Sequence, residues 1–175
     1  MSPIAQTERL DLLPVTLEII EADLHRHDEL PARLDAEIGE GWPPPLMDAT
    51  ALEWTKRAMQ ADPALGGWTA WYWILREPRR TLIGLSGFKS RPVNGAVELG
   101  YSTLPKYQRQ GFATEVVRTM TDWAFAQGVA CVLAETLPDL IASQGVLVKC
   151  GFQFIGAGSE PGAIRFEKKQ NLPAR

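Results

Sequence analysis

Apolar residues in the first third of the chain recur at the spacing of one face of a helix. Leucines and isoleucines over residues 16–38 follow this spacing, which predicts a helical segment that is interrupted at Pro31. A second helix is predicted to begin at Asp48 or Thr50, because both residue types cap helices, and to run to about residue 60.

Strand-like patterns, either alternating or short and apolar, dominate the rest of the chain. They cover residues 8–13, 67–76, 81–88, 96–104, 131–134, 152–157 and 163–168. Short connections between residues 67 and 104 predict an antiparallel meander. Helical patterns over 111–126 and 140–150 separate the later strands. The first of these helices links two strands and therefore predicts their parallel pairing through a right-handed crossover.

The aromatic strand 67–76 has two interpretations. Its tryptophans could line a substrate pocket, but large aromatic side chains in a strand are more often core, and we favour the core.

Composition narrows the class of protein. The chain has 175 residues, of which 45% are hydrophobic and 22% charged, with a formal net charge of −3, so we expect one globular domain over residues 1–175. The absence of a basic run argues against a nucleic-acid partner. No apolar run of membrane-spanning length and no signal pattern is present, so a cytoplasmic location is the default expectation.

The residues that commonly bind metals are not arranged as ligands. Cys131 and Cys150 lie in apolar sequence and are interpreted as small buried hydrophobic residues. His25 and His27 are far from both cysteines and give no zinc spacing, so we expect no metal.

The loop from Tyr107 to Ala113 runs directly into the predicted helix 111–126 and is the best candidate for binding chemistry. Gly111 and Ala113 are small, so a ligand could approach the first N–H groups of the helix. A helix start attracts anions, because these N–H groups lack partners and the helix dipole is positive there. Arg109 could add a charged contact, and a diphosphate is the natural candidate ligand.

Four motifs recur together, in this order, in one known family. They are Thr7-Glu8-Arg9-Leu10, Val97-Glu98-Leu99-Gly100-Tyr101, Gln108-x-x-Gly111-x-Ala113, and Ser143 followed by Lys149-x-Gly151-Phe152. The chain resembles the GNAT superfamily of acetyl-CoA-dependent N-acetyltransferases, and within it the branch that acetylates ribosomal-protein N-termini (RimJ/RimL-like). The resemblance implies an α/β fold with a mixed, mostly antiparallel sheet of about six or seven strands, splayed in the middle and flanked by about four helices.

The resemblance also implies where acetyl-CoA binds, between the strands that end near Leu104 and Ala134. Backbone amides would do most of the binding. The pyrophosphate would be cradled by Gln108, Arg109, Gln110, Gly111, Phe112, Ala113 and Thr114. The pantetheine arm would pair with the main chain of Ser102, Thr103 and Leu104.

Two departures from the family pattern affect catalysis. Leu140 replaces an asparagine that fixes the strand-to-helix turn, and Asp139 or Ser143 could substitute for it. Leu147 replaces a tyrosine that protonates the departing thiolate in many relatives. Ser143, one turn earlier, could hydrogen-bond the thiolate, as the ribosomal-protein branch implies, or bond only to backbone.

Acetyl transfer requires a neutral amine, so a proton acceptor is expected. Glu98 is the first candidate, although bracing the fold or facing solvent is the slightly favoured interpretation for this residue. Glu160, in a surface turn, is the second candidate.

The acceptor is the least determined part of the interpretation. A protein α-amino group is the favoured acceptor, with small amines as the alternative and a non-catalytic CoA-binding sensor as a third hypothesis. Trp42, Trp54 and the rest of residues 40–66 are expected to form the acceptor pocket. Homodimer formation is left open.

Overall fold

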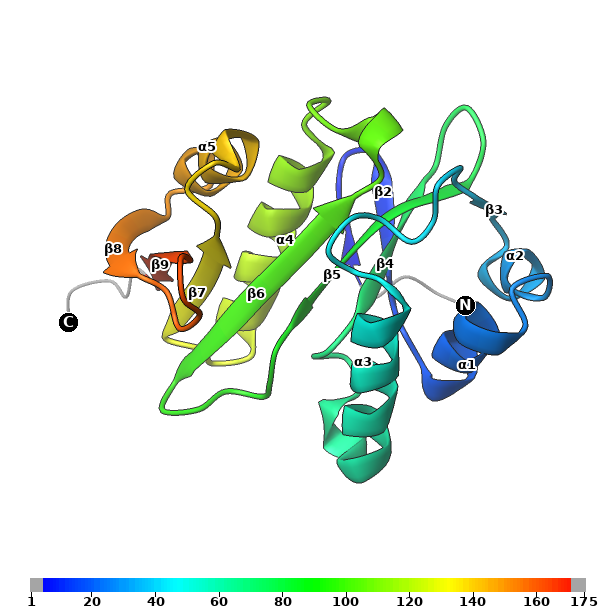
Figure 1. Cartoon of the computed structure of the whole chain (residues 1–175), viewed down its shortest axis with the longest axis horizontal. Coiled ribbons are helices and arrows are strands. Elements are labelled where there is room, and N and C mark those ends of the chain that lie inside the picture. The colour runs from blue at the N-terminus through cyan, green and yellow to red at the C-terminus, as the bar shows by residue number, and fades with distance from the viewer. Residues whose placement is uncertain (1–4, 171–175) are drawn as a thin grey trace.

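The computed structural model describes residues 5–170, which fold as one mixed sheet with helices on both faces (Figure 1). The strands are β1 (Ala5–Gln6), β2 (Leu10–Pro14), β3 (Glu37–Ile38), β4 (Trp71–Leu75), β5 (Thr81–Phe88), β6 (Ala96–Thr103), β7 (Cys131–Thr136), β8 (Gln153–Ala157) and β9 (Ile164–Lys169). The α-helices are α1 (Leu17–His25), α2 (Leu30–Leu34), α3 (Ala49–Ala61), α4 (Phe112–Ala126) and α5 (Ile141–Lys149). None of the helices within this described part is long and apolar enough to cross a membrane.

The strand order is β1-β2-β4-β5-β6-β7-β9-β8, with β3 added beside β5. Antiparallel pairing of β4, β5 and β6 confirms the predicted meander, and parallel pairing of β6 with β7 confirms the crossover through α4. The predicted fold class is therefore confirmed. The described chain has nine strands rather than six or seven, because two-residue strands β1 and β3 carry too short a pattern to be recognised.

The helical segment predicted over residues 16–38, with its interruption at Pro31, is wrong in its details. Thr16 caps α1, its hydroxyl accepting from the Ile19 N–H at 3.3 Å, but the helix ends at His25. Pro31 lies in the first turn of α2 and so begins a helix rather than interrupting one, since a missing N–H costs nothing there. Residues 37–38 then form β3 instead of a helical end.

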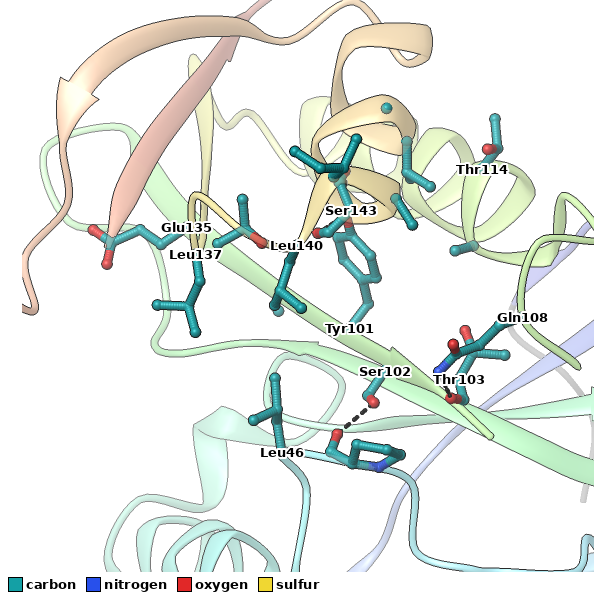
Figure 2. Close-up of a pocket in the computed structure, with 18 of the residues that line it drawn as sticks. Leu46, Tyr101, Ser102, Thr103, Gln108, Thr114, Glu135, Leu137, Leu140 and Ser143 are labelled. Atoms are coloured by element: carbon teal, nitrogen blue, oxygen red, sulfur yellow. Dashed lines mark hydrogen bonds between the residues drawn. The ribbon is translucent and has the colours of Figure 1, made fainter. Parts of the chain in front are cut away.

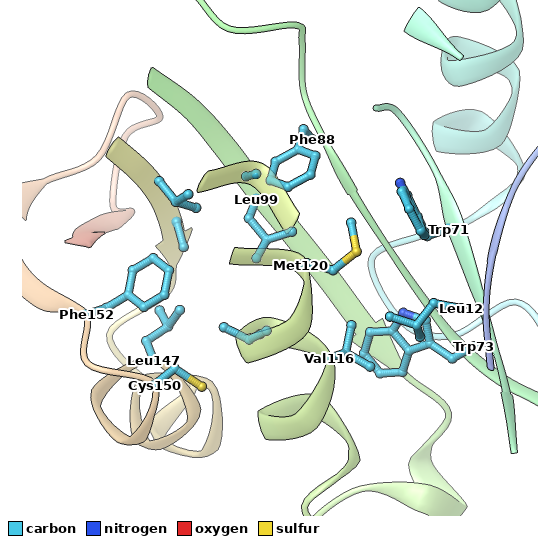
Figure 3. Close-up of a cluster of buried hydrophobic side chains, with 14 of the residues drawn as sticks. Leu12, Trp71, Trp73, Phe88, Leu99, Val116, Met120, Leu147, Cys150 and Phe152 are labelled. Carbon is cyan, nitrogen blue, oxygen red and sulfur yellow. The ribbon is translucent and has the colours of Figure 1, made fainter. Parts of the chain in front are cut away.

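The tryptophan-rich strand is core, as favoured. Alternation along β4 sends Trp71 and Trp73 into the cluster under α4, where they meet Val116 and Met120 (Figure 3). Tyr72 and Ile74 point the other way, into a second buried cluster that packs against α1. These side chains are fully buried, so β4 is the centre of the molecule.

The two cysteines differ in their surroundings. Cys150 is buried in the α4 cluster, as predicted, whereas Cys131 is only half-buried.

The parallel pair at the middle of the sheet is short. Only Ala96–Glu98 of β6 pairs with Cys131–Leu133 of β7, and beyond these residues the two strands diverge (Figure 1). The expected splay is thus present in the structure. It leaves the last five residues of β6 without a strand neighbour on that side, which creates the space for the site.

Candidate active site

A cavity of about 1010 Å³ occupies the region where β6 and β7 part (Figure 2). Its walls come from the end of β6, the loop 107–111, the first turn of α4, the end of β7 and one face of α5. This volume is at the upper end of ordinary ligand pockets and suits an extended ligand.

The first turn of α4 faces this cavity. Gly111 stands before the helix with φ 88°, a left-handed conformation that favours glycine, and within the described residues no side chain caps this helix start. Gln108, Arg109 and residues 111–114 line the cavity. The first N–H groups of α4 therefore have no side-chain partner and face the cavity, where they can bind an anion. These residues fit a diphosphate.

The N-terminal motif braces this loop from behind. The Thr7 hydroxyl donates to Glu115 at 2.6 Å, and Arg9 Nε donates to the same carboxylate at 2.6 Å. Arg9 Nη2 also donates to the Gln110 carbonyl at 2.8 Å, while its guanidinium lies 4.0 Å from the centre of the Phe112 ring. The Glu115 side chain is only 17% exposed.

Ser143 and Tyr101 form a hydroxyl pair inside the cavity. Their oxygens are 2.9 Å apart, and the Tyr101 hydroxyl also lies 3.2 Å from the Ser143 carbonyl (Figure 2). Burial raises the pKa of the Tyr101 phenol to about 12, so the phenol stays protonated at neutral pH. Leu147, at the position of the family tyrosine, is completely buried in the core and cannot replace it.

Along β6, the backbone N–H and C=O groups of successive residues face β5 and the cavity in turn. The Leu104 N–H donates to the Ile83 carbonyl and the Glu98 carbonyl accepts from the Lys89 N–H, both at 2.9 Å, so the even-numbered residues bond toward β5. Tyr101 and Thr103 therefore direct their backbone polar groups to the cavity side, where the Thr103 carbonyl accepts from Gln108 Nε2 at 3.1 Å. Leu104, predicted to pair with pantetheine, is buried with its N–H and its carbonyl both engaged.

The two predicted proton acceptors, Glu98 and Glu160, have different surroundings. Glu98 forms an ion pair with Lys89 and is not among the described residues that line the cavity. Glu160 lines the cavity from the turn between β8 and β9.

Glu135 also lines the cavity, and sequence reasoning missed it. Its carboxylate accepts from Arg165 Nε and from the Ser159 N–H, each at 2.7 Å. Burial alone would raise the pKa of Glu135, but these hydrogen bonds outweigh it and hold the pKa below its ordinary value.

Gln144 fixes the turn from β7 to α5. Its side-chain amide donates to the Pro138 carbonyl at 2.9 Å, so an amide side chain bonds to this turn although Leu140 cannot. Neither predicted substitute has this role: the Asp139 carbonyl, not its side chain, accepts from the Ile141 N–H, and the Ser143 hydroxyl is paired with Tyr101.

The expected acceptor pocket of Trp42 and Trp54 does not form. Trp42 Nε1 donates to the buried Asp23 carboxylate at 2.9 Å, and Trp54 is exposed on α3 away from the cavity. From residues 40–66, only Pro45 and Leu46 line the cavity.

Comparison with known proteins identifies the family. The model of the acetyltransferase (GNAT) domain matches residues 9–153. The uncharacterized N-acetyltransferase YoaA of Bacillus subtilis (strain 168) is 30% identical over 87% of this chain and 84% of its own length. The FsC-acetyl coenzyme A-N(2)-transacetylase of Aspergillus fumigatus is 26% identical over 94% of this chain and 75% of its own length.

A solved structure of RimL, the ribosomal L7/L12 alpha-N-protein acetyltransferase, in complex with coenzyme A, has a similar fold. It superposes with a TM-score of 0.62 at 20% identity, covering 96% of this chain and 97% of the other. The chain belongs to the GNAT family and is an acetyl-CoA-dependent N-acetyltransferase.

Proposed function

We propose that the chain transfers acetyl from acetyl-CoA to the α-amino group at the N-terminus of a protein. The observation that carries this proposal is the open mouth of the cavity, where the side chains of Leu46, Leu137 and Leu140 are exposed. An open apolar mouth admits the end of a polypeptide, whereas a closed acidic cup would favour a small cation. Similarity to RimL, whose name specifies alpha-N-protein acetylation, adds support.

Acetyl-CoA supplies an activated acetyl group and a thiolate leaving group. We assign its pyrophosphate to Gln108, Arg109, Gln110 and the N–H groups of residues 111–114, of which all but Gln110 line the cavity. The alternation of β6 moves the proposed pantetheine contacts from Ser102 and Leu104 to the main chain of Tyr101 and the N–H of Thr103, since the Thr103 carbonyl already accepts from Gln108 Nε2 at 3.1 Å.

Ser143 is assigned to the departing sulfur. When Tyr101 donates to the Ser143 hydroxyl oxygen, the Ser143 hydroxyl hydrogen is free to bond to another acceptor. Ser143 lines the cavity, so this hydrogen can point to a ligand there. A phenol with a pKa of about 12 is a weaker acid than a thiol, so Tyr101 orients Ser143 by hydrogen bonding rather than by giving up its proton. This intact hydroxyl pair favours an enzyme over a non-catalytic sensor.

Glu160 is assigned as the acceptor of the ammonium proton, directly or through a water. It lines the cavity, whereas Glu98 is held by Lys89 and is assigned a bracing role. Glu135 lines the cavity too, but its lowered pKa makes it a poor proton acceptor near neutral pH.

An acceptor panel tests the proposal. Thiol release from acetyl-CoA is measured with three sets of acceptors: peptides with a free N-terminus, the same peptides blocked at the N-terminus but containing lysine, and polyamines, amino acids and aminoglycosides. We expect the free-N-terminal peptides to give the highest kcat/KM. Turnover of a small amine with no turnover of any peptide would overturn the proposal.

Small-amine acetylation is the second candidate function. One observation favours it: the relative from Aspergillus fumigatus is named for transfer to N(2) of FsC and not for a protein acceptor. The same panel separates the two candidates, since each predicts a different best acceptor.

A further inference from the structure

Three exposed leucines gather at one end of the cavity. We call Leu46, Leu137 and Leu140 the leucine rim; their exposed fractions are 76, 41 and 37%. In Figure 2 the rim lies on the side of Tyr101 and Ser143 away from Gln108 and Thr114. The rim is therefore beyond the reacting centre, where the acceptor must approach.

The leucine rim is not explained by folding. Single exposed leucines are common on protein surfaces, but these three come from two separate segments and meet on one cavity. Leu46 also has φ 67°, a left-handed conformation that is unfavourable for a residue with a Cβ atom. Positive φ alone does not mark a site, since Asp35 and Asn94 have it away from the cavity, but Leu46 combines it with exposure on the cavity itself.

The segment that carries Leu46 is held in place from two sides. The Ser102 hydroxyl, at the end of β6, donates to the Pro45 carbonyl at 2.5 Å. Trp42 Nε1 donates to Asp23 at 2.9 Å, and Tyr72 hydrogen-bonds the same carboxylate. These contacts tie residues 42–45 to β6 and α1, so Leu46 is presented by an anchored segment.

One carboxylate in the cavity could receive a cationic head group. Glu160 lines the same cavity, so a carboxylate is available to an ammonium that enters it, although Lys89, Arg109 and Lys149 line the cavity too. A molecule with an ammonium next to an apolar group fits both features.

We infer that the leucine rim selects acceptors whose first residue has a medium or large apolar side chain. The inference rests on the proposed function, because it takes the acceptor to be a polypeptide N-terminus. Apolar contact with a leucine or methionine side chain would remove both partners from water, whereas a charged first side chain would lose hydration against the three leucines, none of which can pair with it.

Peptides that differ only in their first residue test the inference. We would measure kcat/KM with acetyl-CoA for Leu, Met, Ala, Ser, Asp and Lys at the first position. We expect Leu and Met to exceed Ser by about tenfold and Asp by more. Leu46→Asn and Leu137→Asn should each reduce the Leu-to-Ser ratio several-fold, with CoA affinity by calorimetry as the check on folding.

Val148→Asn is the matched control, since Val148 is 61% exposed on α5 and does not line the cavity. It should keep the wild-type ratio. Equal turnover of all peptides, or rim variants with an unchanged Leu-to-Ser ratio, would overturn the inference and leave the proposed function standing. No turnover of any peptide, with turnover of small amines, would instead overturn the proposed function.

Discussion

The two ends of the cavity are built in different ways. The cofactor end is formed by the start of α4 and by the main chain of β6, and it is braced by Arg9 and Glu115. The acceptor end is formed by side chains of the leucine rim, which are exposed and come from different segments.

This difference explains what the departures from the family pattern can change. Leu140 in place of an asparagine leaves the cofactor end assembled, because the Gln144 amide bonds to the same turn. The backbone groups at this end also face the cavity independently of the side chains beside them. At the acceptor end, each side-chain change alters what can bind. Variants at the two ends should therefore separate cofactor affinity from acceptor choice.

The largest effect is expected for Gly111→Val at the cofactor end. A Cβ atom at Gly111 would lie 3.2 Å from Arg9 Nη2, and φ 88° is strained for valine. We expect CoA affinity, measured by calorimetry, to fall by about 100-fold because the helix start can no longer approach an anion.

Gly128→Val is the matched control for this variant. Gly128 follows α4, has φ 85° and has open space around its Cβ position, so it has similar backbone strain far from the proposed anion site. An equal loss of CoA affinity in both variants would mean that helix destabilisation, not the anion site, is responsible.

A smaller effect is expected for Ser143→Ala at the junction of the two ends. Loss of one hydrogen bond to a charged sulfur should lower kcat about tenfold while CoA affinity stays near wild type. Steady-state kinetics with calorimetry measures both quantities. Ser90→Ala, on an exposed turn, is the control; an unchanged kcat in Ser143→Ala would remove Ser143 from the mechanism.

The last effect is expected on pH-dependent stability, not on activity, at the acceptor end. Because the folded-state pKa of Glu135 is lowered, its carboxylate stabilises the fold above its ordinary pKa, and this stabilisation is lost as pH falls through the folded-state pKa. Glu135→Gln should reduce the free energy of unfolding by about 1–3 kcal/mol at pH 7 and by less at pH 3.

Urea unfolding at the two pH values measures this difference. The exposed pair of Glu37 with Arg79 provides the control variant Glu37→Gln, which should change stability little at either pH. The same loss at both pH values in Glu135→Gln would contradict the pKa argument.

Much of the fold followed from the sequence because hydrophobic periodicity and glycine positions are local signals. The meander, the crossover helix and the loop before α4 were predicted in place. The pairing of β6 with β5 decides which backbone groups of β6 face the cavity, and local sequence patterns do not encode that pairing.

Contacts between residues far apart in the chain could not be predicted from local sequence patterns. Glu135 is recognisable as part of the site only once Arg165 and Ser159 lie beside it. Trp42 and Trp54 were expected to form the acceptor pocket, but the buried carboxylate of Asp23 holds Trp42, and Trp54 is exposed on α3.

The contacts of Arg9 have a consequence for how the chain acquires its activity. Arg9 joins Gln110 and Glu115, which are 101 and 106 positions later, so these contacts cannot form during synthesis until most of the chain has emerged. Contacts of such long separation tend to form slowly. Competence to bind CoA is therefore expected to be gained late in refolding, after the local hairpins have formed.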